Sequence, residues 1–147
     1  MYQRLLIATD DSRLSRKAVK AAIGLASATG ASLVVLHVVP QYPTSYFEGA
    51  LSLTAEEIGR VEKSWADKAQ ALVDAVVDSA KAAGVPARSV LASSDHVAES
   101  VIAAARKHKC DLIVMASHGR KGLQRVLLGS ETQHVLTHST IPVLVLR

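Results

Sequence analysis

The sequence predicts an α/β fold, with one domain over residues 1–147 built on a doubly wound parallel sheet of five strands and helices on both faces. Two observations predict it. The strand-like segments are continuous apolar runs, which is typical of strands buried on both faces. These runs alternate with segments whose apolar residues recur every three or four positions, the spacing of an amphipathic helix. An apolar content of 49% with 20% charged residues fits such a fold.

Nine elements are expected in alternating order along the chain. The helices should begin near residues 12, 54, 95 and 130. Residues 41–53 are the least regular stretch and predict a connection without a helix or strand. The expected order of the strands across the sheet is 3-2-1-4-5. The strands themselves are expected at residues 4–9, 32–39, 87–92, 111–116 and 141–146.

Polar residues mark where the helices begin. Residues 10–12, Asp-Asp-Ser, offer N-cap side chains to the first helix, and Gly30 is a typical stop signal at its end. Thr54 and Glu57 have the spacing of a capping box for the second helix. Asp95 can cap the third helix.

Charge and cysteine content restrict the class of protein. The net charge of +4 is a mild excess that requires no nucleic-acid partner, and 3% aromatic residues are too few for stacking bases. Cys110 is the only cysteine, so an internal disulfide is excluded and a structural thiol is expected. No apolar run approaches the ~20 residues of a membrane span, and residues 1–4 start no secretory signal. The sequence therefore predicts a cytoplasmic protein with no membrane partner.

The candidate site lies where the first and fourth strands end. Ligands of open α/β sheets bind at the carboxyl ends of the strands, at the point where the winding reverses. If these two strands are neighbours there, Asp10 and the loop over residues 116–132 face the same crevice. Such a loop, leaving a strand and opening a helix, presents backbone N–H groups and a helix dipole that favour an anion.

Small residues in this loop allow two interpretations. Gly119 and Gly129 lack a Cβ, so the backbone can approach a ligand closely or adopt a positive φ. Ser130, expected at the N-cap, could add a hydroxyl donor to phosphate. Alternatively, Ser130 and Gln133 form a capping box and the glycines are turn residues. The spacing alone leaves both interpretations open.

The whole chain resembles the universal stress protein family, in the branch that binds ATP. The resemblance includes the opening residues 7–12 (Ile-Ala-Thr-Asp-Asp-Ser), the strands at 36–39 and 111–115, and the ending at 141–145. The most specific part is the motif G-x-x-G-x9-G-[ST]. It reads here as Ala116-x-x-Gly119-x9-Gly129-Ser130.

The resemblance implies a binding site for ATP or AMP, with Mg²⁺ as an optional companion and no metal ligand assigned among the side chains. Residues expected at the nucleoside are Ala8, Thr9, Asp10 and the backbone of Val38, with Met115 nearby and Ala116 near the ribose. Residues expected at the phosphates are His118, Gly119, Gly129, Ser130, Glu131 and Thr132.

Three positions depart from the family pattern. Ala116 replaces the first glycine of the motif, which costs ~1 kcal/mol if the site needs a positive φ and is otherwise mild. Glu131 stands where many members carry valine, and its carboxylate would repel a triphosphate unless a cation intervenes. Asp11 replaces a usual glycine and adds negative charge.

Catalysis is not indicated. No nucleophile, base and orienting group accompany His118, so slow ATP hydrolysis is the most that is expected. The other histidines, at positions 37, 96, 108, 134 and 138, have no H-x-x-E-H or similar metal spacing, so structural or surface roles are expected for all five. Arg120, Lys121 and Arg125 make the loop basic.

The last strand, at residues 141–146, would offer unpaired backbone if it lies at a sheet edge, and a homodimer through this strand is expected. The resemblance then implies a stress-response sensor or regulator whose protein partners are unknown. The alternative is a relative that binds no nucleotide and acts through dimerisation and protein contacts alone.

Overall fold

The computed structural model describes residues 1–41, 54–119 and 128–147, and all nine expected elements are present in it. Residues 42–53, which make up nearly all of the connection expected at 41–53, lie outside the described residues. Arg120, Lys121 and Arg125 also lie outside them. In chain order the elements are β1 (Arg4–Ala8), α1 (Arg13–Thr29), β2 (Ser32–Val39), α2 (Ala55–Ala82), β3 (Ala87–Ser93), α3 (Val97–Lys107), β4 (Leu112–Ala116), α4 (Ser130–His138) and β5 (Val143–Leu146).

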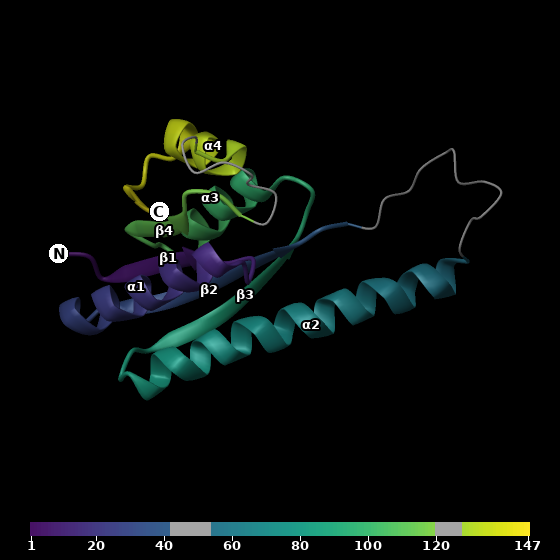
Figure 1. Cartoon of the computed structure of the whole chain (residues 1–147), viewed down its shortest axis with the longest axis horizontal. Helices are drawn as coiled ribbons and strands as arrows, with labels where there is room; N and C mark the ends of the chain where they lie inside the picture. Colours follow the sequence, from purple (N-terminus) through teal and green to yellow (C-terminus); the bar gives the residue numbers. More distant parts are fainter. Residues whose placement is uncertain (42–53, 120–127) are drawn as a thin grey trace.

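The five strands form one parallel sheet in the order β3-β2-β1-β4-β5, which confirms the predicted topology. β1 lies at the centre, between β2 and β4 (Figure 1). The chain winds outward from β1 to β3 and then crosses back to β4. The reversal therefore falls between β1 and β4, where a ligand crevice is expected.

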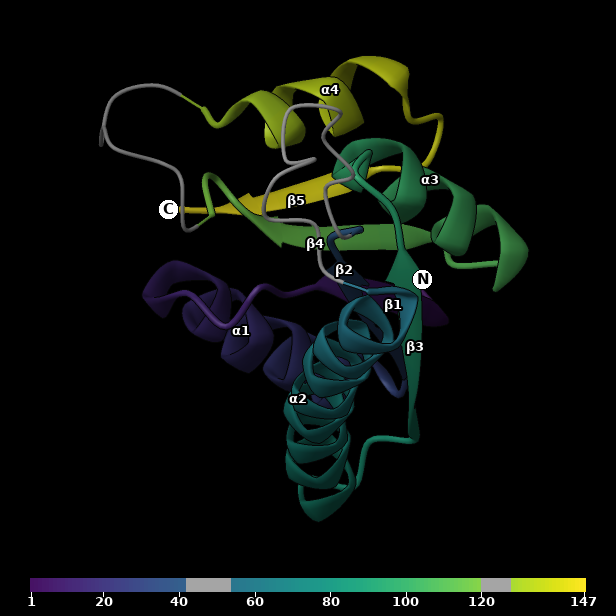
Figure 2. The same ribbon diagram turned by 90° about the vertical axis from the view of Figure 1, so that its right-hand side faces the viewer.

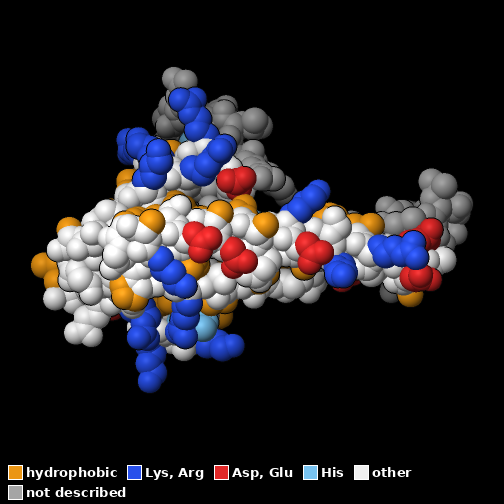
Figure 3. All heavy atoms as spheres, turned by 90° about the horizontal axis from the view of Figure 1, so that it is seen from below, with side chains coloured by type: hydrophobic (Ala, Val, Ile, Leu, Met, Phe, Trp, Pro, Cys, Tyr) orange, Lys and Arg blue, Asp and Glu red, His pale blue; other side chains and the backbone are white. Residues whose placement is uncertain are grey.

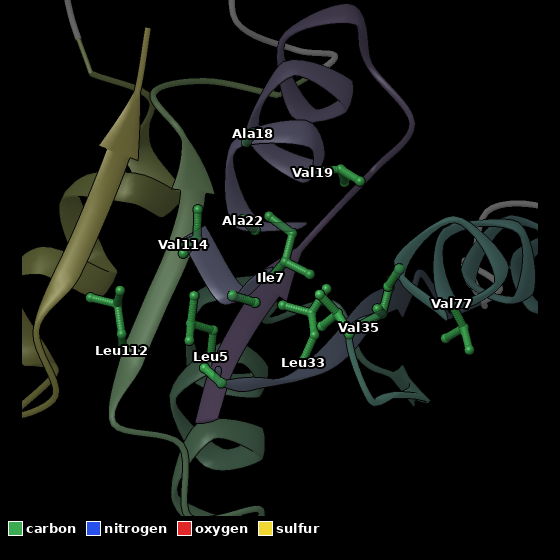
Figure 4. Packing of buried hydrophobic residues seen from close by; sticks show 14 of the residues in the cluster. Leu5, Ile7, Ala18, Val19, Ala22, Leu33, Val35, Val77, Leu112 and Val114 are labelled. Atoms are coloured by element: carbon green, nitrogen blue, oxygen red, sulfur yellow. The ribbon is translucent and has the colours of Figure 1, made fainter. Parts of the chain in front are cut away.

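Helices cover both faces of the sheet, with α1 and α2 on one side and α3 and α4 on the other (Figure 2). Successive residues of a strand point to opposite faces. Leu5 and Ile7 of β1 therefore belong to the same apolar cluster as Ala22 of α1 and Val77 of α2, which Figure 4 shows. Leu6, between them, packs into the second cluster beneath α3 and α4. Both faces of the central strand are buried, which explains the continuous apolar runs in the sequence.

The helix starts show which cap predictions were right. Ser12 is the N-cap of α1 and its Oγ accepts from Ser15 N. Thr54 and Glu57 form the predicted capping box at α2. Asp95 does not cap α3, because the N-cap is His96 and the Asp95 carboxylate accepts from Gln41 N at 3.1 Å. Its carboxylate is thus used to hold the chain beyond β2.

The amino end of the sheet is closed by polar contacts around β1 and β4. The Asp111 carboxylate accepts from the backbone N–H of Gln3 and of Arg4, at 2.8 and 3.0 Å. The Arg4 side chain donates to the carbonyl of His108 at 2.9 Å. Cys110, beside Asp111, is 5% exposed, and burial raises the pKa of its thiol to about 11. These contacts agree with the expected structural role of Cys110.

His108 gives the fold a sensitivity to acid. Burial, then Arg88, Lys107 and Arg4, lower the pKa of His108. Arg88 Nη2 lies 2.8 Å from His108 Nδ1, and because a guanidinium only donates, Nδ1 is the acceptor of a neutral ring. The unfolded chain, with a His pKa of about 6.5, binds the proton more readily than the native chain. This contribution to stability is therefore present above that value and is lost as the pH falls.

We expect His108→Gln to reduce the loss of stability between pH 7.5 and pH 5. A glutamine amide oxygen can still accept from Arg88 but cannot take up a proton. Urea midpoints of both proteins at the two pH values measure the effect. An equal loss in the variant would show that His108 does not contribute to it.

Acidic and basic side chains are interspersed along the face of the molecule seen in Figure 3, where α2 lies. The described helices include none that combines the length and the hydropathy needed to span a membrane.

Candidate functional site

The loops after β1 and β4 touch each other. A Cβ built on Gly119 would collide with Oδ2 of Asp10, so these two residues are in direct contact although they are far apart in the sequence. The contact follows from the parallel pairing of β1 with β4, which brings the carboxyl ends of both strands to the same edge. The structure thus places Asp10 opposite Gly119, as the sequence predicted. Asp10 also accepts from Ser12 N at 2.9 Å, which holds its carboxylate at the start of α1.

Thr9 is buried beneath the crevice, and its polar groups are bonded to other residues of the fold. Its hydroxyl is buried against the Ser15 hydroxyl, and its carbonyl lies 2.7 Å from Nδ1 of His37. Because a carbonyl only accepts, His37 carries its proton on Nδ1. This contact agrees with the structural or surface role expected for His37, and it explains why a single polar residue stands inside the apolar run 33–39.

Asp11 has the left-handed conformation, with φ of 62°. This geometry explains why glycine suits the position, and aspartate is one of the few other residues that tolerate it. Its carboxylate lies 3.8 Å from Nε of Arg16 on α1. The negative charge expected at the site is therefore partly balanced by a neighbouring cation.

Ala116 ends β4 with ordinary strand backbone, since its φ is not positive. Its side chain packs in the apolar cluster beneath α1, and its carbonyl accepts from the buried Thr132 hydroxyl at 3.0 Å. The ~1 kcal/mol cost of a positive φ therefore does not apply to Ala116, and the change from glycine is mild. The Thr132 side chain joins α4 to β4, so only the backbone of Thr132 is left to meet a ligand.

The glycines are required by space rather than by a positive φ. Gly129 has φ of −61°, and a Cβ there would lie 3.2 Å from the Cα of His118 and 3.3 Å from the Ser117 carbonyl oxygen. Gly129 N also donates to that carbonyl at 2.7 Å. The close approach thus joins the end of β4 to the start of α4.

Gly129, not Ser130, is the N-cap of α4, which corrects the sequence prediction. The Ser130–Gln133 capping box is absent, because the Gln133 side chain donates to the Leu128 carbonyl at 2.8 Å. A glycine N-cap has no side chain to cover the first N–H groups of the helix. The start of α4 therefore retains the donors that an anion would use.

The Glu131 carboxylate is directed to another helix. Its Oε2 accepts from Ala98 N in the first turn of α3, at 2.7 Å. α3 has no side-chain cap from its own N-cap residue, His96. Glu131 therefore replaces the cap that Asp95 was expected to supply, and its charge is stabilised by the α3 dipole. The repulsion expected between this carboxylate and phosphate is reduced accordingly.

Replacing Glu131 should show whether its carboxylate caps α3 or faces the phosphates of a ligand. We expect Glu131→Val to lower the free energy of unfolding by about 1 kcal/mol, because the start of α3 loses its acceptor. Glu131→Gln keeps an acceptor oxygen and should lose less. Urea unfolding measures both. A gain in nucleotide affinity in Glu131→Gln would contradict this geometry, since it would show that the carboxylate faces the phosphates.

Three of the expected nucleoside contacts lie on one face of the sheet. Met115 is buried in the cluster beneath α3 and α4, and Ala8 and Val38 pack against it half-buried. They come from the carboxyl ends of three adjacent strands, β4, β1 and β2. The structure therefore brings these three residues together as an apolar flank of the crevice.

A hollow of about 600 Å³ opens on the other face, between the end of β2 and α2. Trp65 and Lys68 of α2 line it opposite Asp11 and His37. Its volume is in the range of small-molecule sites. No motif in the sequence singles out Trp65, so its place in this hollow was not predicted.

His118 lies beside the crevice, next to Gly119 in the chain. His118 is half-exposed, and its Nδ1 lies 3.2 Å from the hydroxyl of Ser117. Over residues 1–41, 54–119 and 128–147, no three His, Cys, Asp or Glu side chains gather as a metal site. The described residues thus supply an acidic group, helix N–H donors and an apolar flank.

Comparison with known proteins assigns the family. The model of the universal stress protein family matches residues 1–147. A universal stress protein of Thermus aquaticus is 35% identical, and the match covers 100% of both chains. The solved structure of the universal stress protein UspA from Lactobacillus plantarum has a TM-score of 0.82 at 21% identity, covering 99% of this chain and 98% of that one. A universal stress protein solved in complex with cAMP has a TM-score of 0.71 at 26% identity, covering 99% and 97%. On this evidence the chain belongs to the universal stress protein family.

Proposed function

We propose that this protein binds an adenine nucleotide, ATP or AMP, in the crevice between the ends of β1 and β4, and acts as a stress-response regulator. One observation carries the proposal. Asp10 and Gly119 are in contact at the point where the sheet reverses its winding. A nucleoside would lie along the β1 side, against Asp10 and the flank of Ala8, Val38 and Met115.

The phosphates would lie at the start of α4. Because Gly119 and Gly129 lack a Cβ, the loop backbone comes close to Asp10 and to His118, and the N–H groups of the first turn of α4 supply donors. Ala116 keeps ordinary strand backbone and Glu131 is engaged by α3. The departures from the family pattern are therefore compatible with an anionic ligand. Mg²⁺ would be carried by the phosphates themselves.

The relative in complex with cAMP supports an adenine nucleotide as the ligand class. The Ser117 hydroxyl lies beside His118, but Ser117 is only 6% exposed and so is poorly placed to reach a substrate, which favours a regulator over an enzyme. A family member of this kind would work in the cytoplasm, where a buried, reduced Cys110 is expected.

Dimerisation would occur through β5. It is an edge strand, and Leu144 on it is 39% exposed. Leu136 of α4 and Leu128 before it are also exposed. A second copy pairing antiparallel with β5 would cover both the unpaired backbone and these leucines.

Released nucleotide tests the proposal directly. The purified protein is denatured and the supernatant is analysed for ATP, ADP, AMP and cAMP. Thermal unfolding is followed in parallel with each nucleotide, with and without Mg²⁺. At ~100 times the dissociation constant, binding should add ~2.7 kcal/mol of stability. No released nucleotide and no shift at millimolar concentrations would instead favour a protein that acts through dimerisation alone.

A further inference from the structure

Two histidines stand side by side on α4, away from the crevice. His134 and His138 are one helical turn apart, and their ring centroids are 4.2 Å apart with 27° between the ring planes. Such a spacing on a helix places both side chains on one face. From sequence spacing alone both were expected to have structural or surface roles. The stacking of the two rings indicates a further role for the pair.

The tautomer of His138 leaves one nitrogen available. Its Nδ1 lies 3.0 Å from the carbonyl oxygen of His134, which can only accept, so Nδ1 carries the proton. Nε2 of the neutral ring then holds a lone pair, on a side chain that is exposed. Histidines that bind metals commonly donate the other ring nitrogen to a carbonyl in this way, which fixes the ring for ligation.

We propose that His134 and His138 form a two-imidazole site for a divalent transition metal ion, Cu²⁺, Ni²⁺ or Zn²⁺. Two nitrogens that each lie ~2.0–2.1 Å from one tetrahedral ion are roughly 3.3 Å apart. The ring centroids lie 4.2 Å apart with 27° between the planes, so the half-exposed His134 ring would have to turn until its lone pair and that of His138 meet at the ion. Imidazole suits these three ions, whereas Mg²⁺ and Ca²⁺ prefer oxygen. His138 also lies in the last turn of α4, where the helix dipole favours a cation.

The site has two protein ligands. No third His, Cys, Asp or Glu joins them in the part of the chain that the structure describes. Glu131 lies on the same side of α4, but its carboxylate is held by Ala98 N. Water or a ligand from another molecule would complete the coordination. Cu²⁺ should bind most tightly of the three ions.

The histidine pair lies away from the proposed phosphate site and from the proposed dimer edge. His138 is about 12 Å along the helix axis from Ser130, and so away from the proposed phosphates. Leu136 is two residues after His134, about 200° around the helix, so the dimer edge is on the opposite flank. Metal binding can therefore be measured independently of nucleotide binding and of dimerisation.

Cu²⁺ titration of the metal-free protein tests the site. Calorimetry should give one Cu²⁺ per chain, and electron paramagnetic resonance should show coupling to two imidazole nitrogens. His134→Ala and His138→Ala should each weaken binding at least roughly tenfold and remove one nitrogen from the spectrum. Circular dichroism checks that both variants keep the fold, which is expected for a half-exposed and an exposed position.

His96→Ala is the matched control, because His96 is an exposed histidine at the start of α3. It should leave Cu²⁺ affinity unchanged. An equal loss of affinity in His96→Ala, or none in either α4 variant, would overturn the proposal.

Discussion

Gly129→Val should abolish the rise in melting temperature that a nucleotide produces, and the fold should survive. A Cβ at this position already lies 3.2–3.3 Å from His118 and the Ser117 carbonyl. The larger valine must push the end of β4 away from the start of α4, so the Gly129 N to Ser117 bond at 2.7 Å is lost and the donors of α4 are displaced. The strain should cost about 1–3 kcal/mol.

The measurement is thermal unfolding with and without Mg-ATP. For a chain of this size, saturation at ~100 times the dissociation constant should raise the melting temperature of the wild type by roughly 5–10 °C. The variant should show no shift. Gly24→Val is the matched control, because a Cβ on Gly24 of α1 meets nothing within 4 Å. A full shift in Gly129→Val would mean that the phosphates bind elsewhere.

Val145→Pro should convert the proposed dimer into a monomer. The carbonyls of Pro142 and Leu146 accept from Ile113 N and Ser117 N of the β4 side. Because backbone groups alternate along a strand, Leu144 also faces β4, and the N–H of Val145 faces the open edge. Proline at 145 removes a donor that only a second copy would use.

The dissociation constant of the dimer should rise by roughly 100-fold, about 1.4 kcal/mol from each of two symmetric copies. Light scattering during size-exclusion chromatography over a concentration series measures it. Leu144→Pro is the informative comparison, because it breaks the β4–β5 ladder inside one chain and should lower monomer stability. A dimer that is unchanged in Val145→Pro would place the interface away from β5.

Local patterns predicted the elements well, because each depends on residues close in sequence. The continuous apolar runs predicted buried parallel strands, and the box of Thr54 with Glu57 predicted the start of α2. The contact between Asp10 and Gly119 was also predictable, since it follows from the order of the strands.

Contacts between elements were not predictable from those patterns. Asp95 had the right position to cap α3, yet Glu131 from α4 provides the acceptor. Ser130 had the right residue type for an N-cap, but the chain approaches so closely at Gly129 that Gly129 is the N-cap and the helix begins one residue earlier. In both cases the deciding contact joins residues that only the folded chain brings together.

The central position of β1 has a consequence for synthesis of the chain. Asp10 is made early, but its counterpart at Gly119 and the helix start after Gly129 emerge only after three further strands. A growing or truncated chain that lacks β4 therefore has half of the crevice and cannot hold a ligand across it. Ligand binding would stabilise only chains that have completed the sheet through β4, and would thereby distinguish finished molecules from unfinished ones.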